Sequence, residues 1–210
     1  MKRLLDGPGD NSAAEYDRIF FERATKPADW FDRRRWKTLL KHYKGGSLID
    51  LGCLDSLVPL WARERDPSAN IWAIDAAPQA MAVMGKILPD INYAVGDVYK
   101  LDFVDNVFDH CIMGEVLEHA QRPGDMIKEA LRVLRPSGIL AISVPLNEHL
   151  EIGAVDKDRH VFSYCLQDFK DLSAGLGEVF DSKVLRSRWF PTYRYSWPTL
   201  IVWIKKYVRI

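Results

Sequence analysis

The sequence predicts an α/β protein: a single domain with a mostly parallel, doubly wound sheet of seven strands. Short apolar runs bounded by Gly, Asp or Pro recur along the 210 residues, as expected of strands buried on both faces. Segments with helical apolar spacing separate most of these runs, as in βαβ units. The run at residues 48–51 is followed by Gly52 and a helix, and such a strand, turn and helix build the ligand crevice of doubly wound sheets.

The elements are predicted in chain order from the spacing of apolar residues. Strands are expected at residues 48–51, 71–75, 91–95, 107–113, 139–145, 179–185 and 199–208. Helices are expected from Leu57 to the charged run before Pro67, and at residues 78–88, 125–134 and 163–176, the last with Ser163 as its N-cap. Asp75 ends the second strand about 20 residues beyond the glycine turn, where nucleotide-binding sheets place a carboxylate for ribose hydroxyls.

The N-terminal part is predicted to be a helical cap at residues 1–44, followed by the main domain at 45–210. Residues 1–14 are expected to be loosely ordered, and Pro27 divides the following helical stretch in two. Its many aromatic side chains are expected to pack against the domain, with a lid over the site as the alternative. The three arginines at 33–35 offer an anion site, but at least two of them are expected on a solvated face.

The composition argues against several classes of protein. With 29 basic and 29 acidic residues the formal net charge is zero, which disfavours a surface dedicated to nucleic acid. The three cysteines, Cys53, Cys111 and Cys165, form no C-x-x-C pair and favour a reduced, cytoplasmic protein. The N-terminus lacks the apolar core of a signal peptide, and no apolar run is long enough to span a membrane. We therefore expect a cytoplasmic protein without a transmembrane segment.

The loop after the first strand resembles the first motif of class I S-adenosylmethionine-dependent methyltransferases, acid-x-Gly-x-Gly-x-Gly. Asp50 and Gly52 match this motif, whereas Leu54 and Ser56 stand in place of its second and third glycines. A dinucleotide-binding G-x-G-x-x-G is not present at this turn, which disfavours an NAD or nucleotide-sugar enzyme. Because Leu54 and Ser56 alter the cofactor loop, a non-catalytic S-adenosylmethionine-binding module remains an alternative.

The resemblance extends along the chain from about residue 48 to 145, with five strands in the order of this Rossmann-like family. It includes the Gly-Asp pair at 96–97, the Phe-Asp pair at 108–109, and a passage at 131–140 similar to the family's R-V-L-K-P-G-G-x-L. Residues 16–20 loosely resemble an N-terminal lid element of the family. The chain resembles most the type that includes ubiquinone-biosynthesis O-methyltransferases.

The resemblance implies S-adenosylmethionine as cofactor, S-adenosylhomocysteine as product, and methyl transfer to an oxygen or nitrogen of a small-molecule acceptor. The implied cofactor residues are Asp50, Gly52, Cys53, Asp75, Ala76, Gly96, Asp97, Val98, Gly114 and Glu115. Methyl transfer requires positioning and sometimes a base, and the candidate bases are His119, His149 and His160. For each histidine, a structural role is the simpler interpretation. The sequence predicts neither the acceptor nor the oligomeric state.

Two further interpretations remain open. Glu115, Glu118 and His119 would share one face of a helix, and with His149 or His160 they offer ligands that suit magnesium, manganese or zinc. A divalent metal is therefore a second, less favoured interpretation, and the arrangement resembles that of small-RNA terminal 2′-O-methyltransferases. The segment 186–198 interleaves basic and aromatic residues, which suits nucleic acid, a sugar or aromatic substrate, or a buried crossover. An RNA methyltransferase is thus a further alternative, although a nucleic-acid partner is disfavoured by the net charge.

Overall fold

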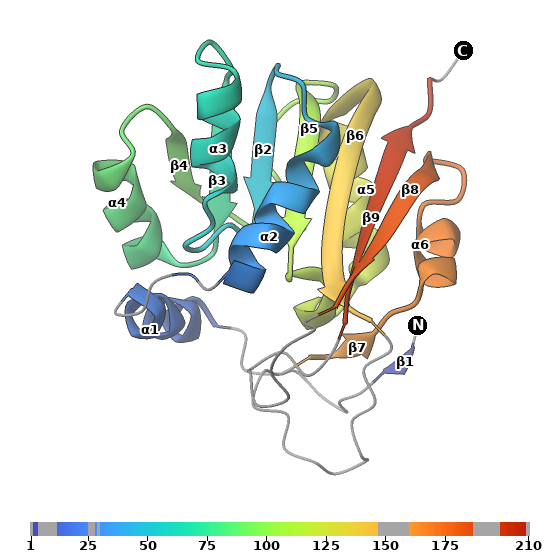
Figure 1. Ribbon diagram of the computed structural model, residues 1–210, viewed down its shortest axis with the longest axis horizontal. Coiled ribbons are helices and arrows are strands. Elements are labelled where there is room, and N and C mark those ends of the chain that lie inside the picture. The colour runs from blue at the N-terminus through green and yellow to red at the C-terminus, as the bar shows by residue number, and fades with distance from the viewer. Residues whose placement is uncertain are drawn as a thin grey trace.

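The computed structural model describes residues 2–3, 12–24, 28, 30–146, 160–186 and 198–208. The main sheet contains β2 (Leu48–Leu51), β3 (Ile71–Asp75), β4 (Asn92–Val95), β5 (Phe108–Gly114), β6 (Leu134–Pro145), β8 (Gly177–Leu185) and β9 (Thr199–Lys206). Its strand order is β4-β3-β2-β5-β6-β9-β8 (Figure 1). The strands β4, β3, β2, β5 and β6 are parallel, and β9 runs antiparallel to both of its neighbours. The predicted fold class, a mostly parallel seven-stranded sheet, is confirmed.

Helices cover both faces of this sheet, as a doubly wound fold requires. They are α1 (Ala13–Ala24), α2 (Trp30–Leu39), α3 (Val58–Arg65), α4 (Pro78–Ile87), α5 (Pro123–Val133) and α6 (Leu166–Leu172), with 3₁₀ turns η1 (Leu40–His42) and η2 (Leu117–His119). In Figure 1, α2, α3 and α4 lie on the near face and α5 lies behind the sheet. The parallel strands all point toward the edge where α1 lies, so their carboxyl ends meet there.

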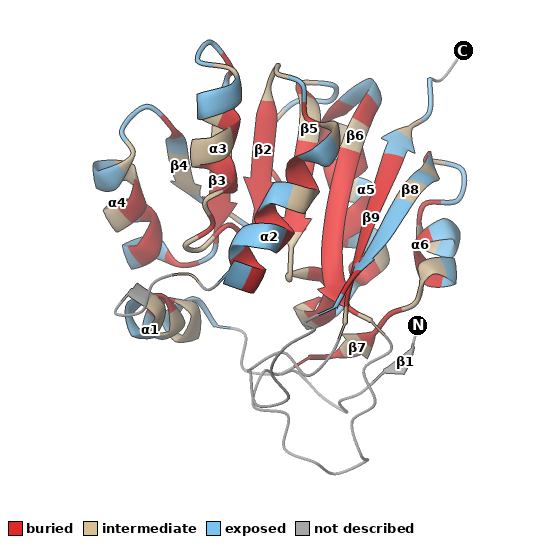
Figure 2. Cartoon of the chain, viewed as in Figure 1, coloured by how far each residue is buried: buried red, intermediate tan, exposed pale blue. Residues whose placement is uncertain are grey.

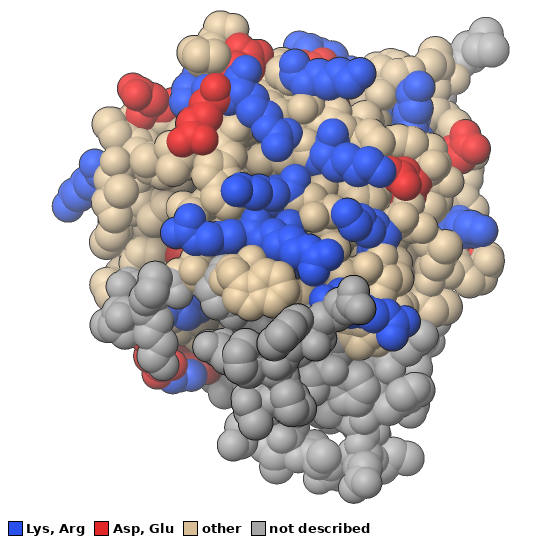
Figure 3. All heavy atoms as spheres, in the orientation of Figure 1, with Lys and Arg blue, Asp and Glu red and all other residues tan. Residues whose placement is uncertain are grey.

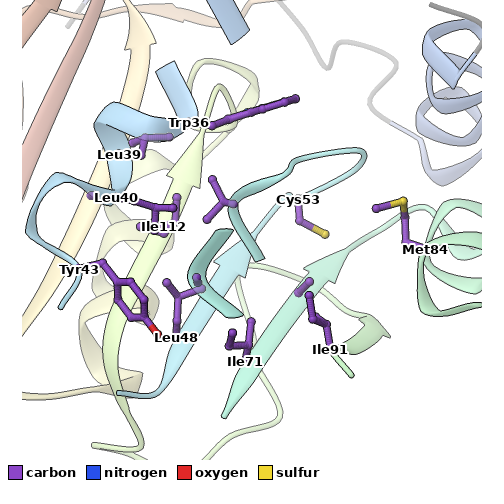
Figure 4. Close-up of a cluster of buried hydrophobic side chains, with 14 of the residues drawn as sticks. Trp36, Leu39, Leu40, Tyr43, Leu48, Cys53, Ile71, Met84, Ile91 and Ile112 are labelled. Atoms are coloured by element: carbon purple, nitrogen blue, oxygen red, sulfur yellow. The ribbon is translucent and has the colours of Figure 1, made fainter. Parts of the chain in front are cut away.

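Two apolar cores, one on each face, hold the layers together. On the α2–α4 face, Leu39 and Leu40 lie over Ile112 of β5 and Leu48 of β2, all at most 2% exposed (Figure 4). On the opposite face, α5 packs on β6 and α6 packs on β8 and β9. Their side chains share one apolar cluster with the other sides of β2 and β5, in which Phe169 is fully buried. Because alternate residues of a strand face opposite sides, such strands are apolar along most of their length. Strand β2 is buried at all four positions, including its one acid, Asp50. Figure 2 shows these buried inner strands beside the largely exposed edge strand β8.

Helix α1 is fixed to the main body through a helix cap. The Asp17 carboxylate is 5% exposed, and its Oδ1 accepts hydrogen bonds from the backbone N–H groups of Gln79 and Ala80, each at 3.0 Å. These are two of the N–H groups that the first turn of α4 leaves without a partner inside the helix. The cap therefore holds α1 at the carboxyl edge of the sheet. That residues 1–44 form a separate cap stays a prediction.

Several predicted boundaries are wrong. Helix α6 begins at Leu166 instead of Ser163, because Ser163 lies in β7 (Phe162–Ser163), which pairs with β1 (Lys2–Arg3). Residues 2–3, expected to be loose, thus form a short strand. The N-cap is Cys165, whose backbone N–H donates to the Asp168 carboxylate at 2.7 Å. Strand β6 is also longer than predicted, because the expected turn before residue 139 is a bulge within one strand.

No helix in the described part of the chain is long and apolar enough to cross a membrane. The three cysteines are all free, with Cys53 and Cys111 buried. Of the predicted basic and aromatic segment at residues 186–198, only its two end residues, Arg186 and Pro198, lie within the described residues.

Candidate active site

A cavity of about 940 Å³ opens at the carboxyl ends of the parallel strands. Its walls come from the loops that follow β2, β3, β4 and β5 and from helices α1 and α2. All ten residues predicted to contact the cofactor line it: Asp50, Gly52, Cys53, Asp75, Ala76, Gly96, Asp97, Val98, Gly114 and Glu115. This wall has two parts. The glycine-loop side consists of Asp50, residues 52–56 and Asp75, and the histidine side consists of residues 115–119 and His160.

The glycine-loop side keeps the backbone of a glycine-rich turn even where the sequence has lost the glycine. Gly52 has φ +67°, and its N–H donates to the Ile74 carbonyl at 2.7 Å. Leu54, at the second motif glycine, has φ +38°, in the left-handed region that favours glycine. Its N–H points at the neighbouring strand end and donates to Asp75 Oδ2 at 2.9 Å. Leu54 therefore has the left-handed backbone that favours glycine, although its side chain departs from the motif.

Asp50 is the buried acid of the glycine-loop side. It is 2% exposed, and burial raises its pKa to about 8, partly offset by a hydrogen bond from the Ser56 hydroxyl. The Ser56 Oγ in turn accepts from the Val58 N–H at 3.1 Å, at the start of α3. Asp50 Oδ2 has no hydrogen-bond partner within the described residues, although it is buried. A buried carboxylate oxygen without a donor is costly, so this atom fits a ligand that brings a cationic or N–H group.

Asp75 supports the loop as well as facing the cavity. Its Oδ2 accepts the Leu54 N–H and its Oδ1 accepts the Ala77 N–H at 3.0 Å. Burial nevertheless raises the pKa of Asp75 above its usual value. Each carboxylate oxygen can accept more than one hydrogen bond, so ribose hydroxyls can still be bound here. The next wall residue, Asp97, is exposed and accepts the Tyr99 N–H at 2.8 Å.

The histidine side differs from the prediction. Glu115, Glu118 and His119 were expected on one face of an α-helix, but Glu115 has φ +57° and only residues 117–119 form a short 3₁₀ turn. Glu115 consequently points to Arg35, with Oε2 and Nη1 3.4 Å apart, and the Arg35 guanidinium also pairs with Asp32 at 2.9 Å. The local backbone, with a left-handed residue before the turn, leaves Glu115 out of the close group of ligand atoms that the other two side chains form with His160, although its charge still acts on Glu118.

Glu118, His119 and His160 form a cluster on this wall. One ligand atom from each side chain lies within 4.8 Å of the other two, and the two imidazole rings are 5.0 Å apart. The backbone holds this arrangement, because the Val161 N–H donates to the Glu118 carbonyl at 2.6 Å. Both candidate bases His119 and His160 therefore reach the cavity. The third, His149, lies outside the described residues.

The cavity is acidic, whereas a neighbouring outer surface is basic. Eight carboxylate side chains and three arginines line the cavity. Figure 3 shows lysine and arginine side chains gathered on the face over α2 and β8, where Arg33, Arg34 and Lys183 border a shallow groove. Two of the three consecutive arginines are solvated, as predicted, and the third, Arg35, is 3% exposed and faces the cavity. A cavity rich in carboxylates suits a ligand with positive charge.

The sequence offered Arg35 only as one of three arginines of a candidate anion site and gave Tyr16 only the alternative role of a lid residue. Tyr16 of α1 lines the cavity with its ring 6.5 Å from that of His119. Phe20 of the same helix is 3% exposed and packs into the core. Helix α1 thus combines the two roles that were considered as alternatives, packing against the domain and forming part of the cavity wall.

Comparisons with known proteins agree with this architecture. Residues 49–142 match a family model described as a methyltransferase domain. The demethylmenaquinone methyltransferase of Renibacterium salmoninarum is 31% identical over 147 residues, which are 66% of this chain and 60% of that protein. The chain spans less than two thirds of the length of the curated relatives it matches first. These matches support the predicted class of S-adenosylmethionine-dependent methyltransferases.

Solved structures share the fold at low sequence identity. The 4+2 cyclase SpnF superposes with a TM-score of 0.78 over the whole of both chains, at 20% identity. An N1-methyltransferase of 1,6-didemethyltoxoflavin from Burkholderia thailandensis, with its acceptor and S-adenosylhomocysteine bound, has a TM-score of 0.73 at 17% identity. That match covers 98% of this chain and 94% of the other.

Proposed function

We propose that the protein transfers the methyl group of S-adenosylmethionine to an oxygen or nitrogen of a small-molecule acceptor. The observation that carries this proposal is Asp50 Oδ2, a buried carboxylate oxygen without a donor in the described chain, at the wall of an acidic cavity. S-adenosylmethionine carries both an ammonium and a sulfonium, so its charge matches this wall. The residues fit the cofactor in position as well, since Asp75 and Asp97 follow the next two strands.

The cofactor, when bound, supplies a methyl group on a positively charged sulfur. The residues of the chain then bind the cofactor and orient it toward the acceptor. We assign Asp50 to the cofactor's ammonium group and Asp75 to its ribose hydroxyls, since charge-assisted hydrogen bonds of this kind are strong. The left-handed turn at Gly52 and Leu54 keeps the backbone close to the cavity. Tyr16 and His119 lie on the remaining wall, and we place the acceptor beside them.

The proposal of a small-molecule acceptor draws on the relatives' names. Demethylmenaquinone and 1,6-didemethyltoxoflavin, named for two of the similar proteins, are both small molecules. The cavity volume of about 940 Å³ accommodates a cofactor together with an acceptor of that size. The resemblance to ubiquinone-biosynthesis O-methyltransferases and the cytoplasmic location belong to this proposal, and the three free cysteines favour a reducing compartment.

A cofactor-binding protein without methyl transfer is the second candidate. It is favoured by the similarity to SpnF, a cyclase by its name, which shows that the fold also occurs in a protein named for another reaction. The two candidates share cofactor binding and differ in turnover.

Isothermal titration calorimetry with S-adenosylmethionine, S-adenosylhomocysteine and NAD tests the cofactor assignment. We expect both sulfur cofactors to bind and NAD to give no heat of binding. Asp50→Asn should weaken S-adenosylhomocysteine binding at least tenfold, whereas Asp102→Asn, an exposed aspartate outside the cavity, should not change it. If neither sulfur cofactor binds the wild-type protein, the proposal is wrong. Formation of S-adenosylhomocysteine with small hydroxylated or amine acceptors then separates an enzyme from a binding module.

A further inference from the structure

Glu118 is buried in an environment that does not explain its burial. It is 1% exposed, and neither of its carboxylate oxygens has a hydrogen-bond partner within the described residues. Ionised carboxylates are rarely buried unless they are paired, hydrogen-bonded or bound to a metal. The folded chain therefore buries a carboxyl group at this point without providing it with a hydrogen-bond donor.

Two imidazoles, those of His119 and His160, lie next to Glu118, and imidazole is a common metal ligand. We propose that Glu118, His119 and His160 bind one divalent transition-metal cation on the histidine side of the cavity. One donor atom from each of the three residues lies within 4.8 Å of the others. In a tetrahedral zinc site with metal–nitrogen bonds of about 2.0–2.1 Å, donor atoms are about 3.3 Å apart, so small side-chain rotations can close the site.

The ligand set and the surrounding charge favour a transition metal. Two imidazoles and one carboxylate suit zinc, manganese or iron better than magnesium or calcium, which prefer oxygen ligands. Glu115 and Asp32 lie nearby and are paired with two guanidiniums, those of Arg35 and Arg23. Three carboxylates against two guanidiniums leave the region net negative when Glu118 is ionised and the histidines are neutral. A cation would supply the electrostatic partner that the Glu118 oxygens lack.

The position of the cluster indicates a role in the reaction. All three side chains line the same cavity as the cofactor residues, so a metal bound by three protein ligands keeps at least one coordination position open to the cavity. This inference rests on the proposed function: the open position takes an oxygen of the acceptor. The acceptor O–H then loses its proton to solvent more readily, the oxygen forms the bond to the methyl carbon, and the carbon–sulfur bond breaks with its electron pair returning to sulfur. The acceptor class is accordingly a hydroxyl compound.

The test is zinc binding by the untagged wild-type protein, measured by calorimetry and by elemental analysis after dialysis. We expect one zinc per chain. Glu118→Gln and His160→Gln should each weaken zinc binding at least 100-fold, and His42→Gln, a histidine outside the cavity that pairs with Asp181, should leave it unchanged. Manganese, followed by electron paramagnetic resonance, should occupy the same site and be displaced by zinc.

Two controls keep the result interpretable. Zinc should raise the melting temperature of the wild-type protein but not that of Glu118→Gln, and the apo form of this variant should melt no lower than wild type, because an unpaired buried charge has been removed. S-adenosylhomocysteine binding should survive Glu118→Gln, so that failure of the metal site and failure of the cofactor site are distinguished. Absence of zinc uptake by wild type, or unchanged zinc affinity in both cluster variants, would overturn the proposal.

Discussion

Asp50 and Glu118 are two buried carboxylates on the wall of one cavity, and their neighbours make them different. They are 2% and 1% exposed, and each has at least one oxygen without a hydrogen-bond donor among the described residues. Asp50 is surrounded by a glycine turn and a serine hydroxyl, whereas Glu118 is surrounded by two imidazoles. The first environment suits an organic cation and the second suits a metal ion. In the two proposals, burial marks each carboxylate as a candidate ligand, and the adjacent side chains determine which cation we expect it to bind.

The glycine-loop side and the histidine side meet at Gly52. We therefore expect its substitution to have the largest effect on stability and on cofactor affinity. A Cβ at Gly52 would lie 2.4 Å from Val116 Cγ2, between the glycine loop and the histidine side. Gly175 is a matched control, because its φ of +74° is similar but nothing lies within 4 Å of its Cβ position. We expect Gly175→Ala to cost about 1–2 kcal/mol from the left-handed backbone alone, and Gly52→Ala about 1–3 kcal/mol more from overpacking.

Urea unfolding measures both variants, and calorimetry measures their affinity for S-adenosylhomocysteine. Only Gly52→Ala should lose affinity. Equal losses of stability in the two variants would show that Gly52 and Val116 are not in tight contact.

Asp75 differs from Asp50 because its carboxylate oxygens already accept hydrogen bonds from two backbone N–H groups. Asp75→Ala should lower stability and also weaken S-adenosylhomocysteine binding, by about 1.5–3 kcal/mol for each charge-assisted hydrogen bond to the ribose. Asp75→Asn retains one oxygen acceptor and should recover part of the stability but little of the affinity. Binding of S-adenosylhomocysteine that is unchanged in Asp75→Ala would remove this residue from the cofactor site.

Asp50 should make both stability and cofactor affinity depend on pH. In the unfolded chain Asp50 ionises near pH 4, whereas in the folded chain it keeps its proton up to about pH 8. The folded state thus binds more protons between these values, so its stability falls as the pH rises, by up to about 1.4 kcal/mol per pH unit, and levels off above pH 8. Asp50→Asn should remove this part of the slope.

Cofactor affinity should change in the opposite direction, because the ammonium binds the ionised carboxylate. Between pH 6 and 8 the wild-type affinity for S-adenosylhomocysteine should rise by up to about tenfold per pH unit, and that of Asp50→Asn should stay flat. Parallel pH profiles of the two proteins would contradict the assignment of Asp50 to the ammonium group.

Leu54 is the site of the smallest expected effect. Because its φ is +38°, glycine should be preferred over alanine there by about 1 kcal/mol, although both lose the packing of a partly buried leucine. Leu54→Gly should therefore unfold at a higher urea concentration than Leu54→Ala and keep or tighten cofactor affinity. If Leu54→Ala is the more stable variant, the left-handed turn is not maintained in solution.

The fold was predictable because its signals are local. Apolar runs and helical spacing located all seven strands of the sheet, and the turn after β2 was indicated by Gly52. The errors arose where tertiary contacts override local preference. Ser163 is a good helix cap by type, but pairing with β1 places it in a strand. Similarly, the spacing of Glu115, Glu118 and His119 suggested a helix, and the left-handed Glu115 prevents it.

The two sides of the site also differ in how far the sequence alone could predict them. The glycine-loop side could be predicted because its residues follow consecutive strands and resemble a known motif. The histidine side depends on His160, which is 41 positions beyond His119 in the sequence and reaches it through the Val161 backbone. Arg35 gave no distinguishing signal either, since it stands in a run of three arginines and only the packing of α2 decides which one faces the cavity.

The most direct test of the account is a crystal structure of the wild-type protein grown with S-adenosylhomocysteine and manganese. The account predicts cofactor density along residues 52–56, with its ammonium group at Asp50 Oδ2 and its ribose at Asp75. It also predicts one anomalous manganese peak between Glu118, His119 and His160. Cofactor density away from Asp50 would contradict the proposed binding site. A well-ordered cofactor without a manganese peak at the cluster would confine the error to the histidine side.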